Sequence, residues 1–378
     1  MGAVTDFFDL DALPVRQADP SWDEDAFHEL AAARPSAASR PDTSFPEVLT
    51  PEEVELTRVP SASTLPLGYY QVGDVHVGGE GYVLRQGKVV RSITVLPTYW
   101  QEMIVANPDL VPPMSARRQR EITRPVLLPI SRDYNNYGHW WLDIAPRLHA
   151  LQRQRPEMLR GSALAIPTDL APWGREILGE LFGIRPEDFE VYDSEREALF
   201  CRHAILPTMT HTNYNFHPWA ADFYRRVVES CSGISVPRVD NGLIYLTRRR
   251  YVHQSRWEVR QLANAPEAEA LAVAMGFTRV SPEELSWREQ VALFSRSRVV
   301  AGEHGSAMKN LLFAPAGAVA VVINHLNGSQ AIIAAMKDQH CLIIKAAGFD
   351  PSRHSNPYTV DLDRLSACLR HAVRLAGA

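Results

Sequence analysis

A glycine-bounded turn that follows an apolar run constrains the fold of this chain more than any other feature. Residues 296–313 read RSRVV and then AGEHGSAMKNLLF, which predicts a buried strand, a tight turn and a helix with Ser306 as its N-cap. A helix start directly after a strand presents unpaired N–H groups and the positive end of the helix dipole, which suits a phosphate. His304 and Lys309 add donors. The same residues also fit an ordinary β–α turn of an α/β domain, so the segment alone leaves two interpretations.

A second segment, YNNYGHWWLDIAPRL at residues 134–148, predicts a helix from about His139. Its apolar side chains recur at helical spacing and are expected to face the core. These side chains are Trp141, Ile144, Leu148 and Leu151. Pro146 has no N–H to donate to the carbonyl of Leu142, so the helix is expected to kink there or to begin later.

Three polar side chains of the same segment, His139, Asp143 and Arg147, recur every four residues and therefore share a face of the helix. A histidine and a carboxylate one turn apart can act together on a hydroxyl proton. A solvated face that carries an Asp143–Arg147 ion pair fits the pattern as well.

Together the two segments resemble the family 61 glycosyltransferases. The family carries N-[YF]-x-H-[WF]-[LI]-x-D-x-[LA]-P-R-[LI], which stands here as NYGHWWLDIAPRL at residues 136–148. A strand that ends in arginine follows, here LIYLTRRR with Arg248 at the matching place. The G-x-HGA-G-L-T-N-x-x-F segment then stands as GEHGSAMKNLLF at residues 302–313. All three motifs in this order are fairly specific, and the resemblance spans residues 67–344.

The resemblance implies an inverting sugar transfer from a nucleotide-sugar, with uridine as the favoured base. A helix dipole and an arginine can replace a metal at the diphosphate, so no divalent ion is expected to be required. The resemblance also implies a GT-B fold, in which two Rossmann-like α/β domains face each other across a cleft. Asp143 is the first choice of base, with His139 as the second choice or as its orienting partner. Arg248 can grip phosphate oxygens in a bidentate way. The donor-binding or substrate-binding residues are expected to be Asn136, Arg147, Arg248, Gly302, Glu303, His304, Gly305, Ser306, Ala307, Lys309 and Asn310.

Several positions depart from the family pattern. Ser306 and Ala307 replace an alanine and a glycine, which crowds the backbone near a ligand. Lys309 stands where a threonine is usual. Glu303 places a carboxylate beside the expected phosphate, which it repels unless it points away or holds a sugar hydroxyl.

Length and composition bound the remaining possibilities. The chain has 378 residues, of which 46% are hydrophobic, so two domains with buried cores are expected. A net charge of −5 argues against general affinity for nucleic acid. Four scattered cysteines fit neither a disulfide framework nor a zinc site, and a reducing bacterial cytoplasm is the simplest location. No signal peptide or membrane span is recognised, so a membrane-linked acceptor would be met from the cytoplasmic side, with peripheral contact at the inner membrane.

The pattern along the chain predicts an α/β protein in four parts. Residues 1–60 are expected to be an irregular extension with one short helix near residues 22–33. Residues 61–235 are expected to form an acceptor-side α/β domain with β-hairpins from Gly68 to Val95. Residues 236–358 alternate strands and helices and predict a parallel sheet that binds the nucleotide-sugar. Residues 359–378 predict a helix that crosses back to the first domain.

Two other functions remain open at this point. The chain also fits a non-catalytic nucleotide-sugar or glycan-binding protein that keeps the fold. A metal hydrolase built from His139, Asp143, His211 and His217 is weaker, because no third ligand stands near the last two at a recognisable spacing. No metal and no cofactor beyond the nucleotide-sugar co-substrate are expected. The partners are expected to be a nucleotide-sugar and a glycan or lipid-linked acceptor. The donated sugar, the linkage and the oligomeric state do not follow from the sequence.

Overall fold

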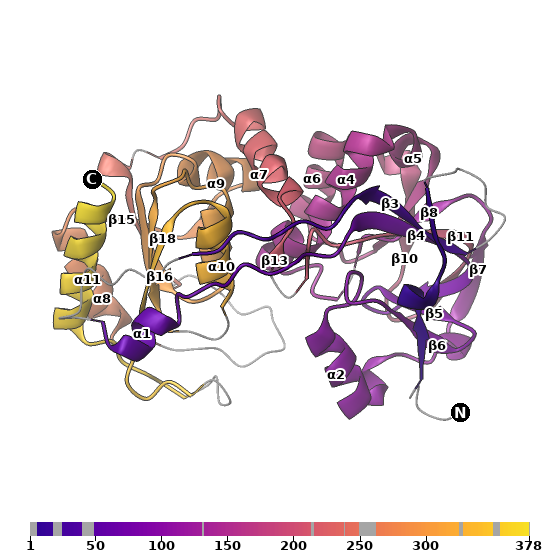
Figure 1. Ribbon diagram of the computed structural model, residues 1–378, viewed down its shortest axis with the longest axis horizontal. Helices are drawn as coiled ribbons and strands as arrows, with labels where there is room; N and C mark the ends of the chain where they lie inside the picture. Colours follow the sequence, from indigo (N-terminus) through magenta and orange to yellow (C-terminus); the bar gives the residue numbers. More distant parts are fainter. Residues whose placement is uncertain are drawn as a thin grey trace. The chain divides into compact units, whose positions relative to one another are not determined.

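The computed structural model describes most of the chain and divides it into two compact units. The described residues are 6–17, 25–39, 49–130, 132–212, 215–237, 239–248, 262–324, 328–350 and 356–377. The first unit comprises Met1–Pro35 and Ser63–Ala220, and the second comprises Ser36–Ala62 and Ala221–Ala378. Each unit is an α/β structure with its own sheet (Figure 1), which confirms the predicted α/β class.

A mixed sheet forms the centre of the first unit. Its strands are β1 (Phe7–Asp9), β2 (Val15–Gln17), β3 (Ala26–Ala31), β4 (Leu67–Gly78), β5 (Tyr82–Arg85), β6 (Lys88–Arg91), β7 (Arg118–Ile122), β8 (Val126–Leu127), β9 (Ala163–Pro167), β10 (Phe189–Tyr192) and β11 (Glu197–Pro207). A small separate hairpin pairs β12 (His211–Thr212) with β13 (Asn215–Phe216). The helices are α2 (Thr98–Ala106), α3 (Tyr137–His139), η4 (Trp140–Ile144), α4 (Ala145–Gln154), α5 (Pro156–Gly161) and α6 (Pro172–Phe182).

The strand order of this sheet joins an antiparallel half to a parallel half. The main path runs β1-β6-β5-β4-β11-β8-β9-β10. The predicted hairpins are β4, β5 and β6, which pair antiparallel with one another. The long strand β11 is antiparallel to β4 and parallel to β7 and β8. Since β8 and β11 are parallel neighbours, the segments that leave their carboxyl ends begin side by side.

Residues 1–60 contain regular structure, so the prediction of an irregular extension is wrong for their described part. The helix expected near residues 22–33 is also wrong, because β3 occupies residues 26–31 and pairs antiparallel with β4. Ala26, Phe27 and His28 are buried in this strand. Pairing with a distant strand has overridden the local pattern here.

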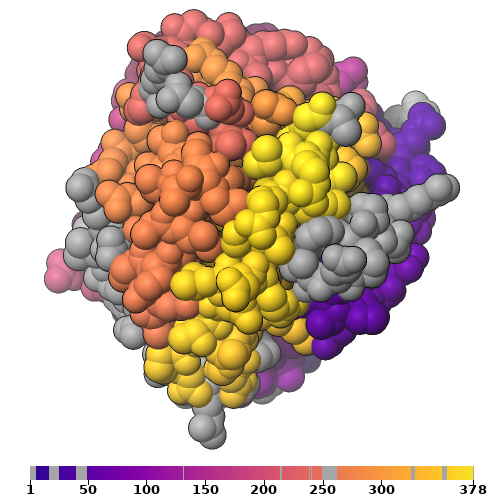
Figure 2. Space-filling model, turned by 90° about the vertical axis from the view of Figure 1, so that its left-hand side faces the viewer, coloured from indigo at the N-terminus to yellow at the C-terminus, as the bar shows by residue number. Residues whose placement is uncertain are grey.

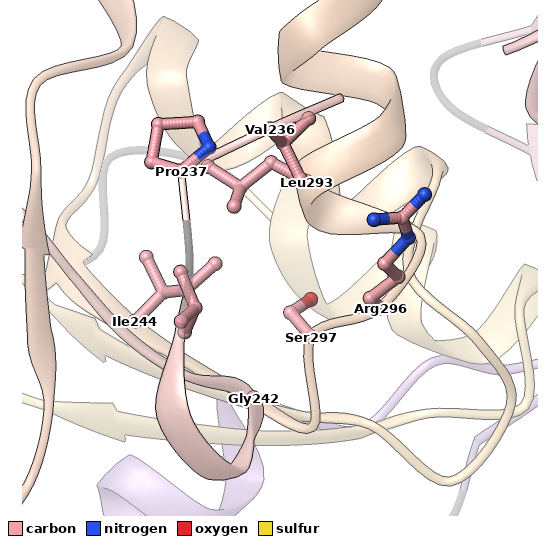
Figure 3. A pocket seen from close by; sticks show the side chains of 8 residues that line it. Val236, Pro237, Gly242, Ile244, Leu293, Arg296 and Ser297 are labelled. Carbon is pink, nitrogen blue, oxygen red and sulfur yellow. The ribbon is translucent and has the colours of Figure 1, made fainter. Parts of the chain in front are cut away.

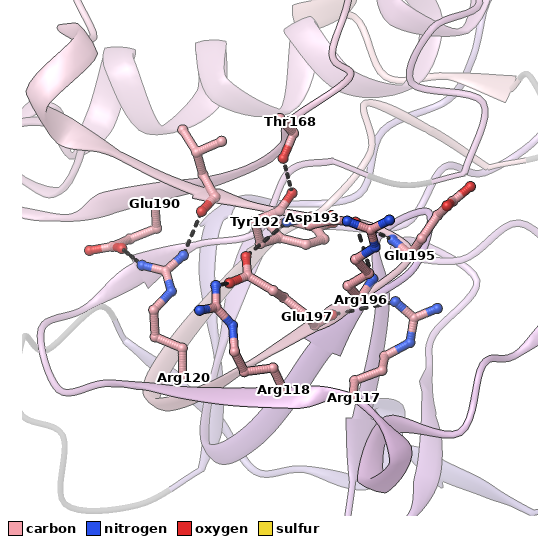
Figure 4. Close-up of polar contacts among 11 residues, drawn as sticks. Arg117, Arg118, Arg120, Thr168, Glu190, Tyr192, Asp193, Glu195, Arg196 and Glu197 are labelled. Carbon is pink, nitrogen blue, oxygen red and sulfur yellow. Dashed lines mark hydrogen bonds and ion pairs between the residues drawn. The ribbon is translucent and has the colours of Figure 1, made fainter.

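Ion pairs hold the edge of the first unit's sheet where β7, β10 and β11 meet (Figure 4). Arg118 pairs with Glu197, and Arg120 pairs with Glu190 at 2.7 Å. Glu197 also accepts a hydrogen bond from the backbone N–H of Asp193 at 2.9 Å. Each of these charged side chains has a partner within the fold, so the network is structural.

The second unit contains a five-stranded parallel sheet with helices on both faces. Its strands are β14 (Leu243–Leu246), β15 (Thr278–Val280), β16 (Val299–Glu303), β17 (Val319–Ile323) and β18 (His340–Ile344). Its helices are α1 (Pro51–Glu55), α7 (Trp219–Ser230), α8 (Ala265–Ala274), α9 (Trp287–Phe294), η8 (Ser306–Leu312), α10 (Ser329–Met336) and α11 (Leu362–Leu375). The near-continuous apolar strands are typical of a parallel sheet covered on both sides.

The order of these strands is β15-β14-β16-β17-β18. The chain passes from β14 through α8 to β15 on one side and then returns through α9 to β16 on the other side. The order therefore reverses between β14 and β16. In open parallel sheets, ligands bind outside the carboxyl ends of the strands at such a switch point.

The terminal helix α11 belongs to the core of the second unit. It packs against α8, β16, β17 and β18 and buries Leu365, Cys368 and Leu369. Figure 2 shows α11 lying along the surface of this unit beside α8. The alternation of strands and helices expected for residues 236–358 is present, although β15 was not expected from the sequence.

Buried Glu53 of α1 ties residues 36–62 to the rest of the second unit. Its carboxylate accepts hydrogen bonds from the backbone N–H of Lys345 at 2.7 Å and from the N-cap Thr50 at 2.8 Å. It also pairs with the guanidinium of Arg364 in α11. Its side chain is only 1% exposed, so these contacts are shielded from water.

We expect Glu53→Ala to lower the free energy of unfolding by about 3 kcal/mol, because it strips partners from buried donors. Glu55→Ala is the matched control on the same helix, since Glu55 and its partner Arg58 are mostly exposed. Its effect is expected to stay within about 0.5 kcal/mol. Urea denaturation measures both changes, and equal effects would contradict a structural role for Glu53.

Candidate active site

The candidate site of the first unit is built by segments that follow two adjacent parallel strands. Ile205 of β11 lies beside Leu127 of β8. The segment after β8 leads into the helix that carries His139 and Asp143, and the segment after β11 leads to His211. The topology therefore brings His211 next to a motif 68 residues earlier in the chain.

The helix at this site contains a π-helical turn, and Asp143 lies in that turn. Residues Trp140–Ile144 form a π-helix between α3 and α4, and the Ala145 N–H bonds to the carbonyl of Trp140. Of the two predicted outcomes at Pro146, a later helix start fits better, because α4 begins at Ala145 and Pro146 stands in its first turn, where a missing N–H is tolerated. Single π turns inside α-helices are frequent at functional sites. The predicted core positions are confirmed, since Trp141, Ile144, Leu148 and Leu151 are fully buried.

The carboxylate of Asp143 lies between two imidazoles. Its Oδ2 is 2.6 Å from Nδ1 of His139, and its Oδ1 is 2.7 Å from Nε2 of His211. Asp143 is 6% exposed and His211 is 5% exposed. The side chain of His139 is 24% exposed, so it is the one of the three that reaches the surface.

The protonation of this group follows from its contacts. Burial raises the pKa of the Asp143 carboxyl, but the hydrogen bonds from His139 and His211 outweigh burial and hold that pKa well below its usual range. An ionised carboxylate only accepts hydrogen bonds. His139 therefore donates from Nδ1, and its neutral form keeps the lone pair on Nε2.

Two other predicted residues support the helix from within the fold. Asn136 is the N-cap of α3, and its side chain accepts from the backbone N–H groups of Gly138 and His139. Arg147 is 1% exposed and donates to the backbone carbonyls of Asp143 and Val95. Burial lowers its pKa to about 10, although the charge of Asp143 opposes this shift. Their roles in donor binding stay predictions.

In the second unit, two predicted residues border the switch point. Arg248 follows the carboxyl end of β14, and Gly302 lies in β16 beside it. A Cβ on Gly302 would stand 2.9 Å from Cβ of Leu246, so glycine permits the close approach of these two strands. The two motifs that carry Arg248 and residues 302–310 therefore lie at the same edge of the sheet, where the parallel strands β14 and β16 end.

The turn after β16 differs from its prediction. Ser306 is the first residue of a 3₁₀ helix, and Gly305 occupies the cap position without a side-chain capping bond. Ser306 as N-cap of an α-helix is therefore wrong. The short 3₁₀ helix weakens the dipole argument for a phosphate site. Gly305, Ser306 and Ala307 at the start of this 3₁₀ helix are at least partly exposed, whereas its later residues are buried.

The remaining residues of this motif contact the protein. Lys309 is buried and donates to the hydroxyl of Ser329. Asn310 is fully buried and donates to Gln290 at 3.0 Å. Glu303 accepts a hydrogen bond from the hydroxyl of Tyr358, and His304 is 5% exposed. Whether these side chains also hold a donor stays a prediction.

The family model described as Glycosyltransferase 61 matches residues 137–322. These residues include His139, Asp143, Arg248 and the turn after β16. The chain belongs to glycosyltransferase family 61. No curated protein matches this glycosyltransferase in sequence. As a glycosyltransferase, the enzyme acts on a sugar donor and an acceptor.

The two histidines of the segment after β11, His211 and His217, make different contacts. Nε2 of His217 lies 3.0 Å from the carbonyl of Ala32, and its Nδ1 accepts the N–H of Trp219. His217 thus supports the fold, whereas His211 bonds to Asp143. Within the described ranges, no group of three or more His, Cys, Asp or Glu side chains is arranged to hold a metal ion.

A pocket of about 210 Å³ lies elsewhere in the second unit (Figure 3). It borders the amino ends of β14 and β16, whereas Arg248 follows the carboxyl end of β14. Its lining is largely apolar: Val236, Pro237, Val239, Gly242, Ile244, Leu293, Arg296 and Ser297. This pocket therefore lies at the opposite end of these strands from Arg248. No helix in the described part of the chain is long and apolar enough to cross a membrane.

We expect Asp143→Asn to destabilise the enzyme in a pH-dependent way. The pKa of Asp143 is depressed in the folded protein. Its charge therefore contributes fully to the free energy of unfolding above the unfolded pKa of about 4, and this contribution is lost as the pH falls toward the folded pKa. The gap in melting temperature between wild type and variant should therefore be widest above about pH 5 and should narrow below pH 4. Thermal melts from pH 3 to 7 measure this gap. Asp109→Asn, at an exposed position after α2, is the control and should show little gap; a pH-independent gap for Asp143→Asn would contradict the expectation.

Proposed function

We propose that the enzyme is an inverting glycosyltransferase in which His139 is the base and Asp143 orients it. The observation that carries this proposal is the His139–Asp143–His211 group, in which Asp143 and His211 are buried and the contacts are 2.6 and 2.7 Å. Both oxygens of Asp143 are already hydrogen-bonded, and a carboxylate with a depressed pKa is a weak base. These contacts favour His139 over Asp143, which was the first choice from sequence alone.

The proposed step moves one proton and one sugar. The acceptor hydroxyl gives its proton to Nε2 of His139 as its oxygen forms a bond to the anomeric carbon. The bond from that carbon to the diphosphate oxygen breaks, and the nucleoside diphosphate leaves with the electron pair. Direct displacement inverts the anomeric centre. Asp143 fixes the tautomer of His139 and stabilises the imidazolium, as the carboxylate of a catalytic triad does.

The donor in this proposal is a nucleotide-sugar whose diphosphate binds at the switch point of the second unit. Arg248 supplies a guanidinium, and the accessible backbone of Gly305–Ala307 supplies N–H groups. These cationic and N–H groups are proposed to balance the diphosphate charge without a required divalent ion. The uridine base, the GT-B arrangement of the domains and a glycan or lipid-linked acceptor at the cytoplasmic face of a bacterial membrane belong to the same proposal. Capsule or exopolysaccharide synthesis is the proposed setting.

We expect His139→Gln to lower the turnover of a UDP-sugar by about 10²–10⁴-fold, which is the usual contribution of a general base. Affinity for UDP should change little, because the base contacts the acceptor. His340→Gln, at an exposed histidine in β18, is the control. The assay measures UDP release over a panel of UDP-sugars with and without glycan acceptors, and full activity in His139→Gln would rule out this base.

We expect Arg248→Lys to weaken UDP binding by about tenfold, because lysine keeps the charge but loses the bidentate geometry. Arg248→Ala should weaken it further. Isothermal calorimetry with UDP measures both, with Arg370→Lys on the exposed side of α11 as the control. UDP bound equally by all variants would contradict the donor role of Arg248. Tight UDP binding without transfer to any acceptor would favour the non-catalytic alternative.

A further inference from the structure

Asp133, in the segment after β8, has a backbone conformation that few residues adopt. Its φ is 66°, which is the left-handed region where side chains other than those of glycine, asparagine and aspartate are strained. Such conformations persist only where the surroundings hold them, and they gather at functional sites. The family match begins at residue 137, so Asp133 lies before it.

The residues around Asp133 fix this conformation from both sides. Arg132 donates to the hydroxyl of Tyr82 at 3.0 Å, and its guanidinium lies 4.2 Å from the ring centre of Trp100. On the other side, the hydroxyl of Tyr134 donates to Asp169 at 2.7 Å. The carbonyl of Asp133 itself accepts the N–H of Asn136, the N-cap of α3, at 2.7 Å. The segment is thus anchored on the sheet, on the loop after β9 and on the helix.

This anchoring aims the Asp133 carboxylate at the side of His139 that faces away from Asp143. Oδ2 of Asp133 lies 3.9 Å from Nε2 of His139, and the two side chains are 23% and 24% exposed. His139 therefore stands between two carboxylates, one at each ring nitrogen. Burial raises the pKa of Asp133, and the nearby positive charges of His139 and Arg132 oppose that shift.

The other charged groups around His139 are already engaged by the protein. His211 bonds to the far oxygen of Asp143. Arg147, in α4, donates to the backbone carbonyl of Asp143. Arg132 turns toward Glu80, to which it pairs at 3.0 Å. Asp133 is thus the charged group that faces the Nε2 side of His139 in the described contacts.

We propose that Asp133 is a second carboxylate of the base site, which positions His139 and stabilises the imidazolium formed when Nε2 accepts the acceptor proton. This inference rests on the proposed function of His139. The new N–H⁺ bond forms at the edge that faces Asp133, so the carboxylate and the proton attract each other directly. Oδ2 is also placed to accept a hydrogen bond from a neighbouring hydroxyl of the acceptor, which favours a sugar acceptor that carries two adjacent hydroxyls.

The test uses Asp133→Asn in the full-length enzyme, because asparagine adopts the left-handed conformation and removes only the charge. Loss of a negative charge at this distance should shift the titration of His139 to lower pH by about one unit or more. Nitrogen-15 NMR of histidine-labelled protein measures the titration, with the His139 signal identified by its loss in His139→Gln. Asp74→Asn is the matched control, since Asp74 also has a positive φ of 51° and pairs with Arg202 at an exposed site.

The activity should move in the same direction. The acid limb of the pH profile of UDP-sugar turnover is expected to shift to lower pH by about as much as the His139 titration. The turnover rate on the plateau above this limb is expected to be about tenfold lower than in the wild type. Asp133→Gly should reproduce both effects while keeping its melting temperature, because glycine also adopts the left-handed conformation without strain. Unchanged His139 titration in both variants, matching Asp74→Asn, would overturn the proposal.

Two further outcomes keep this inference distinct from the proposed function. A shifted titration in a protein that transfers no sugar supports the Asp133–His139 pair and counts against His139 as the base of a transferase. If neither variant folds, the wild-type protein decides: the His139 signal should show a second inflection at acid pH as Asp133 titrates, and a single inflection overturns the proposal.

Discussion

The proposed chemistry depends on one ionised carboxylate that is held out of water by two imidazoles. A lone carboxylate buried to the extent of Asp143 would be expected to take up a proton. The hydrogen bonds from His139 and His211 reverse that tendency and keep it charged. The charge in turn dictates which nitrogen of each histidine carries hydrogen. The position of one acid thus sets the protonation of the whole group.

The secondary structure that supports this group was largely predictable from sequence. Apolar runs and helical spacing predicted the parallel sheet of residues 243–344 and the helix that carries Asp143, because both patterns are local. The strand at residues 26–31 was missed, since its pairing with β4 depends on residues about forty positions away. The 3₁₀ form of the helix after Gly305 was missed because capping preferences assume an α-helical turn.

The composition of the site was only partly predictable for a related reason. His139 and Asp143 share one helix, so their spacing in sequence reports their spacing in the fold. His211 follows a different strand, so no sequence spacing indicates that it lies beside Asp143. Only the pairing of β8 with β11 brings the two residues together. Arg248 and Gly302 lie in separate motifs, yet the parallel pairing of β14 with β16 places them at one edge of the sheet. Both the donor role of these residues and the identity of the base stay predictions.

The π-helical turn at Trp140–Ile144 has a consequence for engineering this enzyme. A wide turn of this kind contains one more residue than the regular helix would need, and it is the less stable form. Deleting a residue there would restore uniform α-helical winding and improve local helix energetics, while changing the direction in which Asp143 and its neighbours within the turn point. Sequence redesign that rewards ideal helices would thus select a change that disrupts the proposed base site. Stability optimisation of this scaffold should hold those five positions fixed.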